Sequence, residues 1–135
     1  MMRLRDPRTG RLRAAAFALL LLAPLPATAA EGDPPYEESL VRLSEILGAL
    51  HYLGPLCGTA QPGEWRSQME ALLSAESPSP ERQARLTAAF NGGYQGFAAL
   101  YRRCTPSAEN AVERYRAEGS KLTREVTTRY GGDAS

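Results

Sequence analysis

Apolar residues recur along residues 36–53 at alternating steps of four and three, the spacing that aligns side chains on one face of an α-helix. Glu37 and Glu38 fall in the first turn, where the helix dipole favours negative charge, and Asp33 or a neighbour is expected to cap the N-terminus. Gly54-Pro55 follows, and we expect the helix to stop there because proline cannot continue the backbone hydrogen-bond ladder. The apolar stripe comprises Tyr36, Leu40, Leu43, Leu47 and Leu50, and it is widened by Val41, Ile46 and Leu53.

Three more segments have the same helical period. Residues 64–75 predict a short amphipathic helix after a loop over residues 58–63. Ser79-Pro80 predicts the start of a third helix that runs to Cys104, and Thr105-Pro106 repeats this signal for a fourth helix that ends at Gly131-Gly132. The residues expected to face inward are Trp65, Met69, Leu72 and Leu73, then Leu86, Phe90, Tyr94, Phe97 and Tyr101, then Ala108, Val112, Tyr115, Gly119, Leu122 and Val126.

No alternation of strand period and no internal repeat interrupts this pattern. The predicted fold is therefore all-α: a small four-helix, bundle-like domain.

The first 30 residues have a different character. Residues 1–13 hold five arginines and one acid, the apolar run Ala14–Ala23 follows, and small residues occupy 27–30. A positive start, a short apolar core and an A-x-A end are typical of a secretory signal peptide, and the run is too short for a bilayer, which takes about 20 residues. We expect cleavage after Ala29 or Ala30, no stable membrane span afterwards, and a periplasmic or secreted protein. The predicted organisation is a signal peptide at 1–30, a flexible segment at 31–35, one helical domain at 36–131 and a tail at 132–135.

The net charge of the chain narrows the classes of partner that it is expected to bind. The whole chain has 135 residues and a net charge of +1, with 16 basic and 15 acidic side chains. Removing residues 1–30 takes away five of the basic and one of the acidic side chains, which leaves a net charge of −3. Such a chain lacks the positive field that nucleic acids require, so we expect no nucleic-acid partner.

Cys57 and Cys104 are the only cysteines. An even pair in a small exported domain favours a disulfide, and in a bundle of alternating helices the ends of the first and third helices share one pole. Redox catalysis and metal binding are the alternatives, but a C-x-x-C spacing is absent and the single histidine is distant. We predict a structural disulfide, no metal and no cofactor.

Residues 90–97 place three glycines inside the predicted third helix, at a cost of about 3 kcal/mol relative to alanine. The favoured interpretation is close approach of another helix, because Gly92 and Gly96 lie one turn apart on the same face. The alternatives are a ligand or partner surface, with Asn91, Tyr94 and Gln95 as polar contacts, and a plain loop.

His51 and Trp65 are the other candidates. His51 would serve as a ligand or a general base, but a protonated imidazole at a helix C-terminus, or one at the edge of the core, is the simpler interpretation. Trp65 is expected to anchor the core beside Met69, with an interface role as the alternative. The predicted partner or ligand surface comprises Asn91, Gly92, Gly93, Tyr94, Gly96, His51 and Trp65.

Motifs spread over residues 36–130 resemble an uncharacterised family of small exported alphaproteobacterial proteins with two cysteines, a domain-of-unknown-function family. The resemblance implies a signal peptide and a disulfide between the separated cysteines, and it brings no activity, ligand or catalytic residue. The matching elements are Tyr36-Glu37, Leu40–Gly48, Leu50–Leu53, Leu56-Cys57, Trp65-Arg66 with Met69 and Leu72, Phe90-Asn91-x-Gly93-Tyr94, and Tyr101-x-x-Cys104-Thr105-Pro106.

Three functions follow from these patterns. The favoured hypothesis is a non-catalytic periplasmic helical module that binds a cell-envelope protein or peptidoglycan, since no catalytic set is assembled along the chain. One alternative is a carboxylate-dependent enzyme acting on peptidoglycan, with Glu45 as a candidate acid. The other is an acid-stress periplasmic chaperone, whose many acids would lose their charge as the pH falls.

Overall fold

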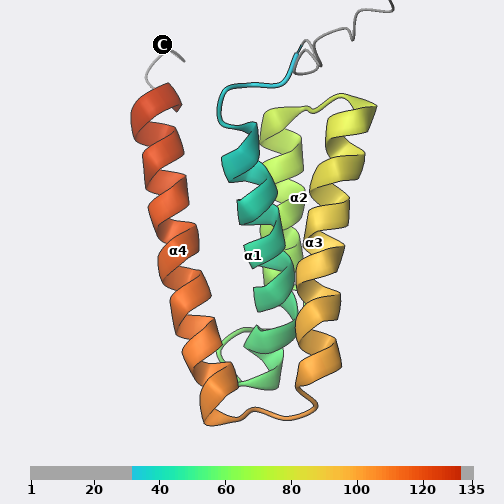
Figure 1. Ribbon diagram of the computed structural model, residues 1–135, viewed down its shortest axis with the longest axis vertical. Helices are drawn as coiled ribbons and strands as arrows, with labels where there is room; N and C mark the ends of the chain where they lie inside the picture. The colour runs from blue at the N-terminus through green and yellow to red at the C-terminus, as the bar shows by residue number, and fades with distance from the viewer. Residues whose placement is uncertain (1–31, 132–135) are drawn as a thin grey trace, which may run out of the picture.

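The computed structural model describes residues 32–131, which form four α-helices joined by short loops. The helices are α1 (Glu37–Leu56), α2 (Glu64–Glu76), α3 (Pro80–Leu100) and α4 (Pro106–Tyr130). Successive helices run in opposite directions and lie side by side along the long axis (Figure 1). The predicted all-α, four-helix domain is confirmed. The predicted signal peptide at 1–30 and the tail at 132–135 lie outside the described residues.

Helix α1 is the centre of the fold, with α4 on one side and α3 on the other (Figure 1). It packs against each of the other three helices, and its apolar residues contribute to two separate clusters. Because both sides of α1 are covered, its stripe is wider than one face. One cluster joins α1 to α4 through Ile46, Leu50, Leu53, Ala108, Ala111 and Val112, and the other joins it to α2 and α3 through Leu40, Leu47, Met69, Leu86 and Phe90.

The predicted starts of α3 and α4 are confirmed. The Ser79 hydroxyl accepts a hydrogen bond from the backbone N–H of Arg82 (3.3 Å), and the Thr105 hydroxyl accepts one from the N–H of Ala108 (3.2 Å). In each case a proline occupies the first helical position, where its missing N–H costs nothing.

The predicted N-terminal cap and the predicted C-terminal end of α1 are wrong, whereas Glu37 and Glu38 fall in the first turn as predicted. Tyr36 is the N-terminal cap residue and makes no side-chain capping bond, while Asp33 pairs with Arg85 instead (2.9 Å). The helix continues through Pro55 to Leu56. A proline so near the end removes one backbone hydrogen bond without ending the helix, and the N–H of Cys57 still donates to the Leu53 carbonyl one turn back.

Helix α3 ends at Leu100, four residues before the predicted end at Cys104. The cause lies in Tyr101, whose backbone is extended (φ −123°, ψ 124°) and whose carbonyl oxygen accepts a hydrogen bond from the Tyr52 hydroxyl. The extended chain carries Cys104 to the lower pole of the bundle, beside the end of α1.

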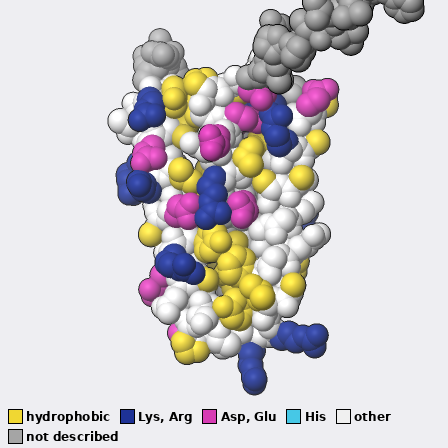
Figure 2. Space-filling view, in the orientation of Figure 1, with side chains coloured by type: hydrophobic (Ala, Val, Ile, Leu, Met, Phe, Trp, Pro, Cys, Tyr) yellow, Lys and Arg dark blue, Asp and Glu magenta, His cyan; other side chains and the backbone are white. Residues whose placement is uncertain are grey.

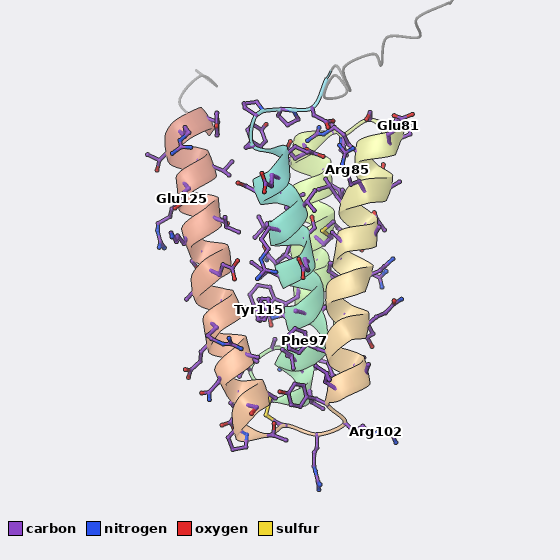
Figure 3. The ribbon with its side chains drawn as sticks, viewed as in Figure 1. Glu81, Arg85, Phe97, Arg102, Tyr115 and Glu125 are labelled. Atoms are coloured by element: carbon purple, nitrogen blue, oxygen red, sulfur yellow. A yellow bond between two sulfur atoms is a disulfide. The ribbon has the colours of Figure 1, made fainter. Side chains whose placement is uncertain are left out.

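Cys57 and Cys104 form a disulfide, as predicted, with their Cα atoms 5.0 Å apart. Figure 3 shows the bond at the lower end of the molecule, between the end of α1 and the start of α4. The alternation of helix direction is what brings the two cysteines together across 47 residues of sequence.

A glycine of α3 and a glycine of α1 each lie against the backbone of the other helix where the two helices cross. A Cβ atom at Gly93 would lie 2.9 Å from the carbonyl carbon of Glu45 and closer still to its oxygen, and one at Gly48 would lie 2.7 Å from the carbonyl carbon of Phe90. These backbones therefore touch at a distance that only glycine permits. The prediction of close approach is correct for α3, but the residue responsible is Gly93.

Gly92 and Gly96 do not make the predicted close contact. Both are exposed, and a Cβ atom at either position would have no neighbour within 4 Å. The two glycines share a face, but this face points to solvent, because α1 packs against the Leu86, Phe90 and Gly93 side of α3.

A buried ion-pair network joins the start of α1, the end of α2 and the start of α3. Arg82 donates to the Glu37 carboxylate from Nη2 (2.6 Å) and Nε (2.9 Å), and also from Nη2 to Glu76 (3.2 Å). Arg85, labelled at this end in Figure 3, donates to Glu37 and Asp33 (2.9 Å each). Glu37 and Arg82 are each only 8% exposed, so their charges stabilise the fold only as a pair.

This network makes stability depend on pH. Burial alone would raise the pKa of Glu37, but hydrogen bonds from Arg82 and Arg85 outweigh it and hold the pKa below its ordinary value of 4.5. A carboxyl group whose pKa is lower in the folded state stabilises the fold above the unfolded pKa, and this stabilisation is lost as the pH falls through the folded pKa. We therefore expect the melting temperature to fall as the pH is lowered below about 4.5.

The Glu37→Gln variant tests this linkage by thermal unfolding between neutral and acidic pH. We expect it to be less stable than the parent by about 1–3 kcal/mol at neutral pH, because it leaves charged donors poorly paired, and to lose less stability on acidification. The matched control is Glu125→Gln, which removes an exposed carboxylate 3.8 Å from Lys121. An unchanged acid dependence in the Glu37 variant would contradict the assignment.

Candidate functional site

The outer surface of α3 carries no charge over most of its length. Residues 86–101 contain no acidic, basic or histidine side chain, although more than half of them are exposed. Figure 2 shows this flank, on the α3 side, without charged side chains between the charges at its two ends. We call it the uncharged face of α3. Its exposed residues are Thr87, Ala88, Asn91, Gly92, Tyr94, Gln95, Gly96, Ala99 and Leu100.

Two large side chains border this face. Tyr94 is 37% exposed and Leu100 is 73% exposed, and they are the only exposed large apolar side chains of residues 32–131. Tyr94 was expected to face the core, but its helix position turns it toward solvent at the edge of α1. The Tyr94 ring rests on Tyr52 (5.4 Å between centroids) and on His51 (5.3 Å). It is therefore held in place and still available to a partner.

His51 lies at the edge of the core between aromatic rings. Its ring centroid is 5.5 Å from that of Phe90, and its Nδ1 atom is buried without a hydrogen-bond partner among the described residues. Burial, and then the positive charge of Arg66, lowers the pKa of His51. The lowered pKa favours the neutral imidazole, as the core-edge interpretation expects.

Trp65 lies on another side of α1, away from the uncharged face of α3. Its indole nitrogen packs on the backbone of Gly54, where a Cβ atom would lie 3.0 Å from it. The side chain is half-buried and contacts both apolar clusters. The predicted set is therefore divided: Asn91, Gly92, Tyr94 and Gly96 share one surface bordered by His51, Gly93 is inside the α1–α3 contact, and Trp65 belongs elsewhere.

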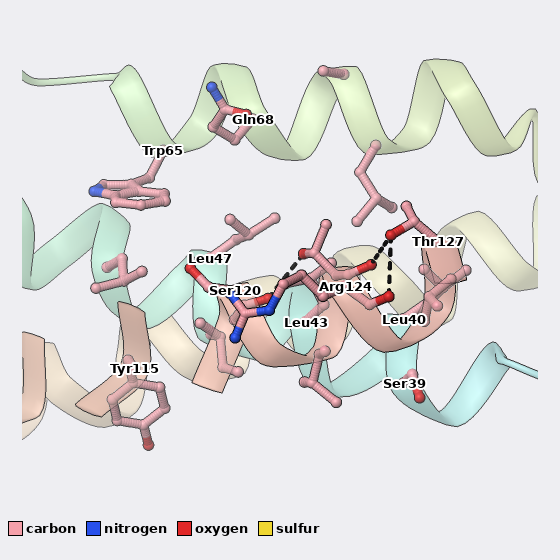
Figure 4. Close-up of a pocket in the computed structure, with 18 of the residues that line it drawn as sticks. Ser39, Leu40, Leu43, Leu47, Trp65, Gln68, Tyr115, Ser120, Arg124 and Thr127 are labelled. Atoms are coloured by element: carbon pink, nitrogen blue, oxygen red, sulfur yellow. Dashed lines mark hydrogen bonds between the residues drawn. The ribbon is translucent and has the colours of Figure 1, made fainter. Parts of the chain in front are cut away.

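Trp65 lines an apolar groove of about 670 Å³ between α2 and α4. The groove exists because α2 and α4 both pack on α1 but hardly on each other. We call it the α2–α4 groove. Figure 4 shows Trp65 and Gln68 on the α2 wall, Ser120, Arg124 and Thr127 on the α4 wall, and leucines of α1 between them. Its apolar lining includes Leu40, Leu43, Ile46, Leu47, Leu50, Trp65, Leu72, Leu122 and Val126.

Sequence reasoning missed this groove. The stripe Tyr115, Gly119, Leu122 and Val126 was assigned to the core, but all four are only partly buried. The signal exists only when two segments are taken together: Ala71 and Ala75 of α2 and Gly119 and Ser120 of α4 are too small to fill the space between the two helices.

Arg42 attaches the middle of α4 to α1. It donates to Glu118 from Nε (2.7 Å) and Nη2 (2.9 Å), pairs with Glu45 (3.0 Å), and lies over the Tyr115 ring at 5.3 Å. Figure 3 shows Tyr115 and Phe97 in this region, between α4 and α3. Hydrogen bonding to Arg42 lowers the pKa of Glu118.

The carboxylates near these surfaces are already engaged. Glu45 pairs with Arg42, and Glu76, the one carboxylate that lines the groove, pairs with Arg82. A glycosidase needs two carboxyl groups that face each other across a cleft, and the groove does not supply them. Within residues 32–131, no cluster of three or more metal-ligating side chains occurs.

These features define a small helical domain with one disulfide, an uncharged face on α3 and an apolar groove between α2 and α4. The chain belongs to the family described as "Protein of unknown function (DUF2385)", which matches residues 35–130. The resemblance to a domain-of-unknown-function family is confirmed, while the alphaproteobacterial origin stays a prediction. Neither the curated proteins nor the solved structures contain a match. In the part of the chain that the structure describes, no helix is long and apolar enough to cross a membrane.

Proposed function

We propose that this chain is a non-catalytic binding module exported to the cell envelope, where a partner protein docks on the uncharged face of α3. The observation that carries the proposal is the absence of charge from residues 86–101 on a helix surface open to solvent. A solvated helix face normally carries charged residues, and the centre of a protein interface is depleted of them.

The glycines support the same surface. Gly92 and Gly96 each lower helix stability by about 1 kcal/mol relative to alanine, and no packing contact offsets this loss. Without side chains, they leave the α3 backbone open to close approach by a partner helix or strand. Tyr94 and Leu100 at the edges supply the larger apolar contacts that anchor an interface.

A charge placed in this face tests the proposal. The mature chain is titrated against envelope extract, the captured partner is quantified, and the Gln95→Lys variant is compared with Gln83→Lys. Both glutamines are exposed on α3, but only Gln95 lies in the uncharged face. We expect saturable capture that Gln95→Lys weakens about tenfold or more, which corresponds to 1.4 kcal/mol, and that Gln83→Lys preserves.

Two results would oppose the proposal: no saturable partner under several growth conditions, or equal capture by both lysine variants. Sedimentation with purified peptidoglycan separates the wall from a protein as the partner. Binding to peptidoglycan alone would assign the uncharged face to the wall.

The acid-stress chaperone is the second candidate, because the network around Glu37 loses its ionic bonds on acidification. It requires the domain to open and to protect client proteins at about pH 3, below the ordinary pKa of carboxyl groups. A domain that stays closed at this pH, or that opens without protecting clients, excludes it. The peptidoglycan-acting enzyme has no comparable support, since Glu45 is bound to Arg42.

A further inference from the structure

The α2–α4 groove is open to solvent and runs along α1. Its floor is formed by α1, and Leu40, Ile46, Leu47 and Leu50 there are between 1% and 6% exposed. The lining residues of α1 extend from Ser39 to Leu50, which at 1.5 Å per residue is about 16 Å. The groove is therefore a long apolar slot.

The size of the slot favours a small ligand over a protein. Its volume of about 670 Å³ falls within the range of roughly 300–1,000 Å³ that is typical of small-molecule sites. A stable protein interface needs about 800 Å² from each partner, but a docked helix would reach only the edges of this slot because the floor is already covered. A thin, flexible apolar chain can lie between the two walls, against the partly exposed side chains of Leu72, Leu122 and Val126.

The charge at the edge of the slot indicates what the chain must carry. Arg116 and Arg124 of α4 line the groove, and neither forms an ion pair with any residue of 32–131. Two nearby acids are already paired, Glu118 with Arg42 and Glu125 with Lys121, and Glu113, three residues before Arg116, forms no ion pair with it. Figure 4 shows Arg124 next to Ser120 on the α4 wall. A guanidinium group beside a hydroxyl group suits a carboxylate, which arginine binds through two parallel hydrogen bonds.

From these observations we infer that the α2–α4 groove binds a single-chain anionic amphiphile, a long-chain fatty acid. The acyl chain lies along α1, between the small residues of α2 and α4, and the carboxylate lies at the edge with Arg116 and Arg124. The carboxylate forms ion pairs with the arginines, and transfer of the acyl chain from water into the apolar slot favours binding. This site does not involve the uncharged face of α3.

Trp65 gives a direct assay, since it is the only tryptophan of the chain and it lines the groove. The mature protein with its disulfide intact is titrated with palmitate below the micellar concentration, and the Trp65 emission is recorded. We expect a saturable change with a stoichiometry of one. Arg116→Gln and Arg124→Gln should each weaken the affinity several-fold. The matched control Arg114→Gln, an exposed arginine of α4 outside the groove, should leave it unchanged.

Two further experiments test the need for an open slot and for a charged headgroup on the ligand. Ala71→Phe, on the α2 wall, should fill the slot and abolish binding while the circular dichroism spectrum and melting temperature stay close to those of the parent. Hexadecanol should bind about tenfold more weakly than palmitate, because it lacks the charge. The inference is overturned by an unsaturable emission change, by equal binding of acid and alcohol, by full binding in a folded Ala71→Phe variant, or by tighter binding of a lysophospholipid. Gln95→Lys should not alter palmitate binding, so this inference and the proposed docking on α3 can fail separately.

Discussion

Replacing Gly93 by alanine is expected to destabilise the domain by about 3 kcal/mol, because the new methyl group must occupy space held by the backbone of α1. The nearest atoms are the Glu45 carbonyl group and the Ala49 nitrogen, which belong to the main chain and cannot rotate away. The two helices must therefore separate, and the apolar contacts of Leu86 and Phe90 with α1 loosen. Gly48→Ala should have a similar effect, since it meets the backbone of Phe90. Denaturant unfolding of the mature protein measures both.

Gly92→Ala and Gly96→Ala are the matched controls for this prediction. They lie on the same helix, face open space, and should stabilise the fold by up to about 1 kcal/mol each through better helix propensity. Opposite signs for neighbouring Gly92 and Gly93 are thus expected. Equal effects at the two positions would contradict the packing of α1 on α3.

Loss of the disulfide is expected to cost about 4 kcal/mol, because the bond closes a loop across 47 residues and so restricts the unfolded chain. Total stabilities of small domains are about 5–15 kcal/mol, so this is a large share. In this fold α4 contacts α1 but hardly any other helix, and the bond joins the start of α4 to the end of α1. The α1–α4 cluster around Ile46 and Val112 should therefore lose protection first.

The Cys57→Ala/Cys104→Ala double variant tests this by thermal unfolding and amide hydrogen exchange. Reducing agent added to the parent protein should reproduce the loss of stability, and the same agent should leave the double variant unaffected. A melting temperature that is unchanged in both experiments would show that the helix contacts alone determine the stability.

Local chemistry made much of the fold predictable. Ser79-Pro80 and Thr105-Pro106 each specify a helix start. The hydroxyl group accepts a backbone hydrogen bond and the proline ring presets the backbone angle, and these two effects involve residues no more than four positions apart. The end of α3 was misplaced because Tyr101 leaves the helix to receive a hydrogen bond from Tyr52, which lies 49 residues away. No local pattern contains that contact.

The candidate site was less predictable, for a related reason. The glycine-rich segment is unusual in sequence, but its helical period does not reveal which of its faces meets α1. Gly92 and Gly93 are adjacent in sequence, yet only Gly93 lies against α1. The ion pairs of Arg82 leave no local signal either, since its acidic partners Glu37 and Glu76 come from two other helices.

From its amino acids alone, this chain is an all-α domain with one pair of cysteines and an odd, glycine-rich third helix, because helical period and capping depend on residues close in sequence. Other features arise only from how whole helices pack. They are the position of α1 between its neighbours, the Gly48–Gly93 crossing, the ion pairs of Arg82 and the slot between α2 and α4. Packing depends on side-chain volume summed over distant segments, and in this chain small residues on α2 and α4 leave a space whose existence no single segment indicates.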